Sequence, residues 1–203
     1  MHFLKENKRL FFAALLIPPF LFYWDELVMT WLREFHRLHS GIAAVLQSAD
    51  RVMYFAAHGT TMIAGAALLY LYSRYSNRRY YDLSGTLLIG LVSSGIFVQV
   101  VKHAIGRARP RISDSLLIIG PSLRGSYDSF PSGHTAMAFC LAYILSRHYP
   151  AFRILFYLFA VCEGMARIDG TSHFPSDVIA GAIVGVAIAK IVKSKLPAAQ
   201  QGA

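Results

Sequence analysis

The chain has 203 residues, of which 55% are hydrophobic and 15% are charged, and its mean hydropathy is +0.44. These values are typical of a membrane protein and argue against a water-soluble domain. The formal net charge is +9, but the Lys and Arg residues stand in short groups between long apolar runs. Membrane topology therefore explains the charge, and we expect no nucleic-acid partner.

Six apolar runs are candidate membrane spans, at about residues 10–24, 52–73, 83–104, 133–149, 152–168 and 177–192. Several are shorter than the ~20 residues that cross a bilayer core, as expected of helices that begin or end at a polar site below the membrane surface. The basic N-terminus resembles a signal peptide, but no small-x-small cleavage pattern follows Trp24, which predicts a retained first membrane helix. The adjacent Pro18 and Pro19 predict a kink within that helix.

The segment between the first two spans predicts one further helix. Leu27, Trp31 and Leu38 fall on one helical face, whereas Arg33 and Glu34 fall on another. This pattern is typical of a helix that lies in the membrane interface, and a plainly packed helix is the alternative. The expected fold class is therefore an all-α polytopic membrane protein with six transmembrane helices and an interfacial helix, organised as one domain over residues 1–203.

The positive charges predict the orientation of the spans. Six spans place both termini on the same side of the membrane, and the basic residues of that side, from Lys5 onward, make it cytoplasmic by the positive-inside rule. Six cations on the opposite side break this rule: Lys102, Arg107, Arg109, Arg111, Arg124 and Arg167. Chance or contact with lipid headgroups is one explanation for Arg107, Arg111 and Arg124, whose roles stay open, but Lys102, Arg109 and Arg167 each belong to a spaced motif.

The first two motifs place cations beside a helix N-terminus. In "KHAIGRARP", Lys102 and Arg109 stand seven residues apart, close to two helical turns, so both can point the same way before Pro110 ends the helix. In "PSGH", Ser132 can cap the fourth helix and Gly133 lets backbone N–H groups approach an anion. His134 would then project from the first turn of that helix, where the helix dipole adds positive potential.

The third motif, "RIDGTSHFPSD", begins with Arg167 at the end of the fifth span. Its His173 and Asp177 are four residues apart, so the carboxylate can accept from one imidazole nitrogen and leave the other free. Each motif alone is a weak signal. Together they bring two arginines, a lysine, two histidines and a capped helix to one face, a set that suits a tetrahedral, multiply charged oxyanion, above all phosphate.

These three motifs, from Lys102 to Pro110, from Pro131 to His134 and from Arg167 to Asp177, resemble the signature of the type 2 phosphatidic acid phosphatase family. The resemblance implies a membrane phosphatase that works through a phosphohistidine intermediate, with no metal and no other cofactor. By position, it implies that His173 is the nucleophile, that Asp177 orients it and that His134 protonates the leaving oxygen. The phosphate-binding residues that it implies are Lys102, Arg109, Ser132, Gly133 and Arg167.

One residue departs from the family pattern, since Ala166 stands where the family often has Ser before the third-motif arginine. We expect this change to weaken phosphate binding without abolishing the chemistry, because the charged groups supply most of the attraction. Glu163, one turn earlier, is unusual within a membrane helix, and we expect it to pair with Arg167 or with His58.

The expected partners are the lipid bilayer and a lipid phosphate, with the active site on the extracytoplasmic face of the inner membrane. Phosphatidylglycerophosphate, phosphatidic acid, a polyprenyl phosphate or pyrophosphate and the phosphate of lipid A all remain open as substrates, and no feature predicts the oligomeric state. The alternative functions are a lipid phosphotransferase that uses the same site, a vanadate haloperoxidase, against which six spans argue, and a membrane transporter, suggested by His58, Gln99 and Glu163 within spans.

Overall fold

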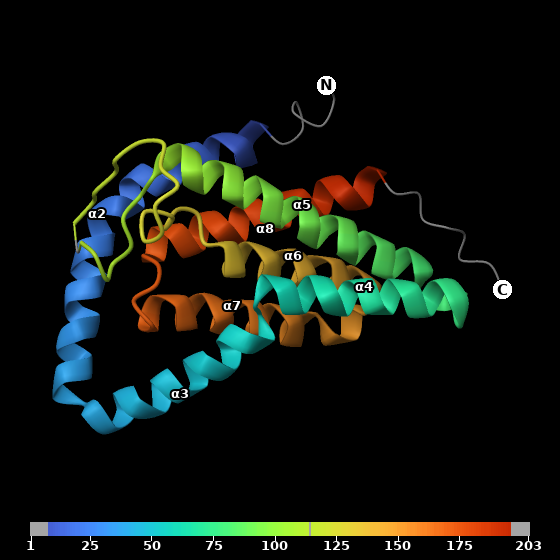
Figure 1. The fold of residues 1–203 in the computed structure, drawn as a ribbon, viewed down its shortest axis with the longest axis horizontal. Coiled ribbons are helices and arrows are strands. Elements are labelled where there is room, and N and C mark those ends of the chain that lie inside the picture. The colour runs from blue at the N-terminus through green and yellow to red at the C-terminus, as the bar shows by residue number, and fades with distance from the viewer. Residues whose placement is uncertain (1–7, 114, 196–203) are drawn as a thin grey trace.

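The computed structural model describes residues 8–113 and 115–195, so the predicted cytoplasmic Lys5 lies outside the described residues (Figure 1). The described residues form seven α-helices and no strand, which confirms the all-α prediction; a single isolated bridge joins Arg107 and Ile118. The helices are α2 (Lys8–Leu38), α3 (Ser40–Ala56), α4 (Gly59–Tyr75), α5 (Tyr81–Ile105), α6 (Gly133–His148), α7 (Arg153–Asp169) and α8 (Pro175–Lys195). Two short 3-10 helices, Arg78–Tyr80 and Pro150–Phe152, precede α5 and α7.

Helices α4 to α8 run alongside one another, while α2 crosses one end of this bundle and α3 returns beneath it (Figure 1). The C-terminal ends of α5 and α7 and the N-terminal ends of α6 and α8 lie at the end that α2 crosses. The long connection between α5 and α6, residues 106–132, covers the same end. All three sequence motifs are therefore carried to one end of the bundle.

The core of the bundle is built around α6, which packs against α4, α5, α7 and α8. Its apolar centre includes Leu91 of α5 together with Met137, Cys140 and Ile144 of α6, all of which are buried. All residues of α6 except the last two are buried or half-buried, so its neighbours nearly enclose it. A helix of 16 residues can therefore sit at the centre of the bundle although it is shorter than a full membrane span.

The contact between α6 and α8 depends on two glycines of α8. A Cβ atom at Gly185 would lie 2.0 Å from the carbonyl oxygen of Ala136, and one at Gly181 would lie 2.5 Å from the carbonyl oxygen of Ser132. Their spacing of four residues is the small-xxx-small pattern that lets two membrane helices approach at backbone distance. The start of α6 is thereby held directly against the start of α8.

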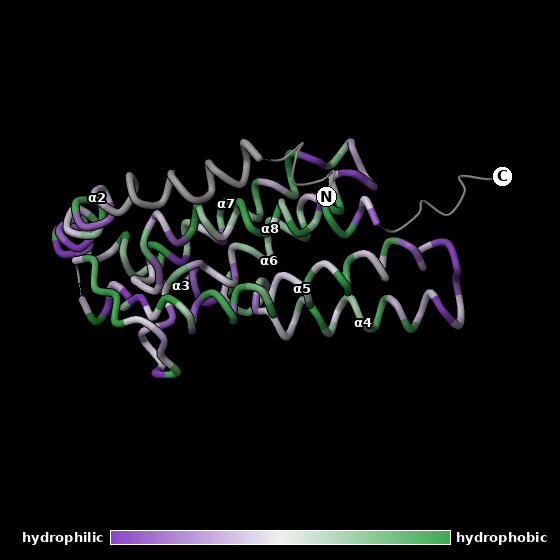
Figure 2. The backbone as a smooth tube through the Cα atoms, turned by 90° about the horizontal axis from the view of Figure 1, so that it is seen from above, coloured by the Kyte–Doolittle hydropathy of each residue, from purple (hydrophilic) through white to green (hydrophobic). Residues whose placement is uncertain are grey.

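Apolar helices of membrane-spanning length are present, but six spans are not confirmed. Among the described residues, Arg78–Ile105 and Pro175–Lys195 are long and apolar enough to cross a membrane, and Ser40–Ala56 with Gly59–Tyr75, bent by 40°, forms a third if taken as one span. Helices α6 and α7 have only 16 and 17 residues. Figure 2 shows hydrophilic residues concentrated toward the two ends of the bundle, with mostly apolar residues along α4 and α5 between them.

Two boundaries differ from the sequence prediction. The second predicted span, 52–73, is interrupted at Ala57 and His58, where α3 ends and α4 begins. The helix predicted over 27–38 is not separate, because α2 continues without a break from Lys8 through Pro18 and Pro19 to Leu38. Its predicted apolar face is the exposed one, whereas the opposite face packs into the bundle through Met29 and Leu32.

Candidate active site

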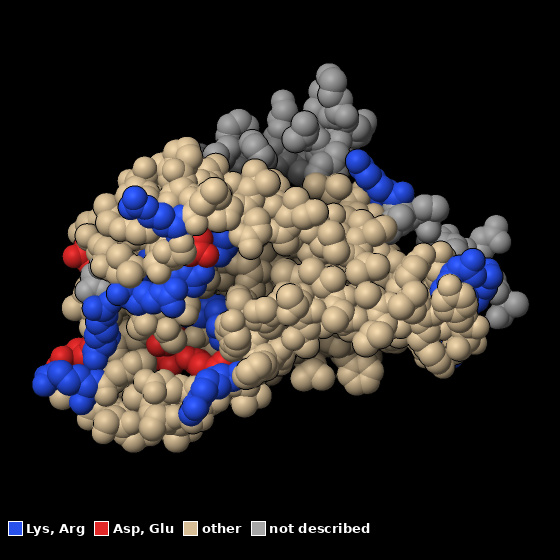
Figure 3. Space-filling model, in the orientation of Figure 1, with Lys and Arg blue, Asp and Glu red and all other residues tan. Residues whose placement is uncertain are grey.

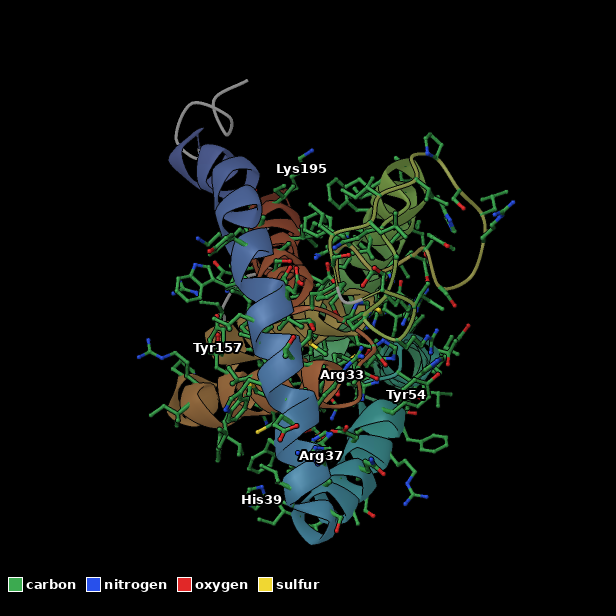
Figure 4. The ribbon with its side chains drawn as sticks, turned by 90° about the vertical axis from the view of Figure 1, so that its left-hand side faces the viewer. Arg33, Arg37, His39, Tyr54, Tyr157 and Lys195 are labelled. Atoms are coloured by element: carbon green, nitrogen blue, oxygen red, sulfur yellow. The ribbon has the colours of Figure 1, made fainter. Side chains whose placement is uncertain are left out.

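Charged side chains gather at the end of the bundle that α2 crosses. Figure 3 shows Lys, Arg, Asp and Glu residues around a hollow at this end, with few charges along the rest of that face until the opposite end. Figure 4 views the same end and shows α2 running across the front of the other helices, with α3 and its Tyr54 beside it. Arg33 of α2 donates a hydrogen bond to the carbonyl oxygen of Pro110 at 2.7 Å, which ties the connection between α5 and α6 to α2.

The two cations of the first motif meet at Asp128. Arg109 binds this carboxylate with two donors, Nε at 2.9 Å and Nη2 at 2.8 Å, and Lys102 Nζ lies 3.8 Å from Oδ2 while donating to the Asp128 carbonyl oxygen at 2.7 Å. Burial alone would raise the pKa of Asp128, but the hydrogen bonds and charge of Arg109 and the charge of Lys102 lower that pKa well below its usual range. Asp128 is therefore an ionised carboxylate between two predicted phosphate-binding cations.

The predicted helical register of the first motif is wrong. Helix α5 ends at Ile105, and Gly106 follows in the left-handed conformation with a φ of 64°. A Cβ atom at Gly106 would lie 1.8 Å from the carbonyl oxygen of Gly120, so glycine is required there. Arg109 consequently lies in the following connection, and it reaches Lys102 through Asp128 rather than along one helical face.

The second motif lies beside the other two. Ser132 is the N-cap of α6, as predicted, although its Oγ is a distant 3.5 Å from the Thr135 backbone nitrogen. The Ser132 backbone N–H donates to the carbonyl oxygen of Asp177 at 2.9 Å, which joins the second motif to the third. A Cβ atom at Gly133 would lie 3.9 Å from Cε of Lys102, so the first motif is in van der Waals range as well.

His134 lies in an aromatic cluster that the sequence did not predict. Its ring centroid is 5.2 Å from that of Tyr54 and 5.4 Å from that of His58. Among the described residues, no hydrogen-bond partner exists for its buried Nε2 atom. The guanidinium of Arg167 lies 5.3 Å from the centre of the Tyr54 ring, so Tyr54 is close to both the second-motif histidine and the third-motif arginine.

Arg167 is held by two neighbouring residues. Its Nε lies 3.0 Å from Glu163 Oε1, and both side chains are buried, so of the two partners expected for Glu163, Arg167 is the one in contact. Arg167 Nη2 also donates to the carbonyl oxygen of Asp50 in α3 at 3.3 Å. The third-motif arginine is therefore fixed between α7 and α3.

His173 and Asp177 lie side by side and are both almost inaccessible to solvent. His173 Nδ1 is 3.6 Å from Asp177 Oδ2, which is close to but beyond hydrogen-bond distance. Burial lowers the pKa of His173 to about 4, because desolvation disfavours the imidazolium. The imidazole is thus neutral near pH 7, the form in which it can act as a nucleophile.

Four residues that carry no predicted role lie close to this pair. Asp177 Oδ2 accepts hydrogen bonds from Ser129 Oγ at 2.6 Å and from the Phe174 backbone N–H at 2.8 Å, while Oδ1 accepts from Arg107 Nη1 at 2.5 Å. Arg107 also binds Asp25 of α2. The explanation of Arg107 by chance or by lipid headgroups is therefore wrong, since its side chain is only 1% exposed, whereas Arg111 and Arg124 are exposed.

A cavity of about 200 Å³ opens between α3 and the C-terminal end of α7. Its lining residues are Asp50, Arg51, Tyr54, Phe55, Ala166, Arg167, Gly170 and Ser172. Ala166 lines this cavity, so the hydroxyl that the family often has before the third-motif arginine is missing from its wall. Ser172 also accepts, through its carbonyl oxygen, a weak hydrogen bond of 3.5 Å from Arg109 Nη1, which connects the cavity to the first motif.

The chain is similar to known proteins in both sequence and fold. A lipid A 1-phosphatase from Rhizobium johnstonii is 40% identical over 104 residues, which cover 49% of this chain and 42% of that protein. This chain therefore spans less than half of the length of that relative. Among solved structures, Aquifex aeolicus LpxE has a TM-score of 0.53 at 23% identity, over 74% of this chain and 86% of that one.

A second solved structure, a PAP2-type phosphatidylglycerolphosphate phosphatase from Bacillus subtilis, has a TM-score of 0.51 at 22% identity, over 84% of this chain and 95% of that one. At these identities, the two solved structures establish a shared fold. The model of the PAP2 superfamily matches residues 83–200, a range that contains the whole of all three motifs. Since this match covers more than half of the sequence, the chain belongs to the PAP2 superfamily.

Proposed function

We propose that this protein is an integral membrane phosphatase that hydrolyses the phosphate of a lipid, with His173 as the nucleophile. The observation that carries the proposal is the convergence of three motifs from α5, α6, α7 and α8 around one buried, neutral imidazole. Family membership and the similarity to a lipid A 1-phosphatase support the same class of reaction.

The substrate phosphate would be held by cations and by a helix N-terminus. Lys102, Arg109 and Arg167 would supply its positive partners, and the backbone N–H of Gly133, at the start of α6, would point at one of its oxygens. Guanidinium and ammonium groups stabilise the negative charge on the three oxygens that are transferred. Ser132 would contribute through its hydroxyl, which also caps α6, because its backbone N–H is already donated to the Asp177 carbonyl oxygen.

Two chemical steps complete the reaction. In the first, His173 Nε2 attacks phosphorus in line, the bond from phosphorus to the lipid oxygen breaks, and His134 donates a proton to that oxygen. Asp177 stabilises the positive imidazole ring through Nδ1–H, a contact that tightens from 3.6 Å when the ring becomes charged. In the second step, His134 takes a proton from water, which attacks the phosphohistidine and releases inorganic phosphate and neutral His173.

The lipid tail would lie against the exposed apolar side chains of α3 and α7. Phe55 lines the cavity that Arg167 also lines, and the same two helices expose further large hydrophobic residues: Val52, Leu158, Val161 and Met165. In a membrane, this surface faces lipid acyl chains rather than water. A lipid headgroup can then enter the site sideways, from the bilayer, with its phosphate reaching Arg167 first.

We further propose that the chain forms one domain with six spans and with both termini in the cytoplasm, so that the site faces away from the cytoplasm. The junction of α4 and α5 lies at the end of the bundle opposite the site (Figure 1), and it is basic, with Arg74 in the last turn of α4 and Arg78 and Arg79 in the following 3-10 helix. Under the positive-inside rule, that basic end is cytoplasmic. The substrate would then be taken from the extracytoplasmic leaflet.

Lipid phosphate hydrolysis is expected to depend on His173. Purified protein should release inorganic phosphate from at least one of phosphatidylglycerophosphate, phosphatidic acid, a polyprenyl pyrophosphate and lipid A. His173→Ala should reduce this rate by at least about a thousandfold, because loss of a nucleophile removes the covalent route. His148→Ala, the same change at an exposed histidine of the opposite end, is the matched control, and retained activity in His173→Ala would refute the mechanism.

Asp128 should compete with phosphate for Lys102 and Arg109. Asp128→Asn removes the competing charge, so the inhibition constant for inorganic phosphate should fall about tenfold, given that a hydrogen bond to a charged group contributes about 1.5 kcal/mol. Asp82→Asn, an exposed position at the other end of α5, should leave this constant unchanged. An unchanged or higher constant in Asp128→Asn would mean that this carboxylate supports the site rather than competing in it.

Membrane orientation can be tested with single cysteines in a Cys140→Ala, Cys162→Ala background. A cysteine in place of Leu123, whose side chain is 86% exposed in the connection above the site, should react with an impermeant thiol reagent in intact cells. A cysteine in place of Ser76, in the basic turn between α4 and α5, should react only after the membrane is opened. The reverse labelling pattern would place the site on the cytoplasmic face.

A further inference from the structure

A buried ionic network connects α2 to the start of α8. Arg107 donates from Nη2 to Asp25 Oδ2 at 2.7 Å and from Nη1 to Asp177 Oδ1 at 2.5 Å. Nη1 also donates to Ser176 Oγ at 2.7 Å. All four side chains are at most 2% exposed. Charges buried to this degree require partners with good geometry, because removal of one partner leaves an uncompensated charge in the interior.

Asp25 acts on α8 as an N-terminal cap supplied by another helix. Its Oδ1 accepts the backbone N–H of Ser176 at 2.9 Å, and its Oδ2 accepts the Ser176 hydroxyl as well as Arg107. A carboxylate in this place satisfies a backbone donor of the first turn and interacts favourably with the helix dipole. Asp25 therefore fixes the turn from which Asp177 projects, 152 residues later in the sequence.

Arg107 fixes the carboxylate of Asp177 itself. One oxygen of Asp177 is occupied by Arg107, and the other by Ser129 and the Phe174 backbone N–H. The guanidinium of Arg107 also lies 4.2 Å from the centre of the Phe174 ring, directly after His173 in the chain. The carboxylate plane is consequently set by this network and not by the 3.6 Å contact with His173.

We infer that Asp25 and Arg107 are positioning residues, which hold the Asp177 carboxylate in the orientation that the His173 imidazolium needs. This inference rests on the proposed function. Asp25 lies outside residues 83–200, the range that the family model matches, so α2 would be part of the catalytic apparatus and not only a membrane anchor. Neither residue touches the phosphate, whose proposed contacts come from Lys102, Arg109 and Arg167.

The first test is Asp25→Asn in full-length purified protein, with the rate expressed per folded molecule. The amide keeps the shape and the acceptor for Ser176 but loses the charge that holds Arg107. We expect kcat to fall about 10- to 100-fold, the range that small misplacement of a catalytic group produces, with KM and the inhibition constant for phosphate within about twofold. Glu26→Gln, a neutralisation at the next, exposed residue of α2, should leave kcat unchanged.

A double variant separates positioning from simple stabilisation of the fold. If Asp25 acts through Asp177, the Asp25→Asn, Asp177→Asn protein should be no slower than Asp177→Asn alone, because the carboxylate to be positioned is already gone. The inference would be overturned if the kcat losses of the two single variants multiplied in the double variant, or if Asp25→Asn had a normal kcat. Should Asp25→Asn not fold, Ser176→Ala keeps every charge and should still lower kcat while leaving KM unchanged; a normal kcat there would count equally against it.

These outcomes can be told apart from failure of the proposed function. If the unmodified protein releases no phosphate from any lipid phosphate, the proposed function itself is wrong. If the unmodified protein is active and only the response of kcat to Asp25→Asn or Ser176→Ala is absent, the phosphatase assignment stands and the role given to α2 is wrong.

Discussion

The buried carboxylate of Asp177 is the constraint on which the active end of the molecule depends. A carboxylate with no solvent exposure must be surrounded by donors, and Asp177 obtains them from three separate parts of the chain: Arg107, Ser129 and the Phe174 backbone N–H. Arg107 in turn requires Asp25 of α2. The need to satisfy one carboxylate thus fixes the connection between α5 and α6, the start of α8 and the crossing of α2 over the bundle.

Charge balance explains how so many cations can gather there without substrate. Each cation of the network has a carboxylate partner: Lys102 and Arg109 have Asp128, Arg167 has Glu163, and Arg107 has Asp25 and Asp177. The partners differ in exposure, since Asp128 is 25% exposed and the other carboxylates are fully buried or nearly so. Under the proposed function, Asp128 would therefore be the carboxylate that an incoming phosphate displaces, while the buried carboxylates stay paired with their cations.

Sequence reasoning identified the candidate catalytic histidines but not the residues that hold the candidate site together. The local motifs around His134 and His173 are visible because their spacing is short, and the N-cap at Ser132 follows from residue type alone. The pairing of Arg107 with Asp25 spans 82 residues, and no local pattern encodes it; the one available signal was an acidic residue directly after an apolar stretch. Gly106, as a helix-ending glycine, could have shown that Arg109 lies beyond α5. The number of membrane spans could not be predicted from apolar runs, because α6 is stabilised by enclosure in the bundle instead of by length.

The proposed mechanism passes the phosphate through a covalent bond to His173. To test for this bond directly, the protein is mixed with a radiolabelled lipid phosphate and the reaction is quenched rapidly without acid. Peptide mass spectrometry then identifies the phosphorylated residue. A phosphohistidine intermediate predicts an acid-labile, alkali-stable phosphate on the peptide that contains His173. Its amount should increase when His134 is replaced by Ala and a substrate with a good leaving group is used, because the second step then lacks its base. Phosphate on another residue would contradict this mechanism. So would turnover in which oxygen exchange shows that water attacks the substrate directly.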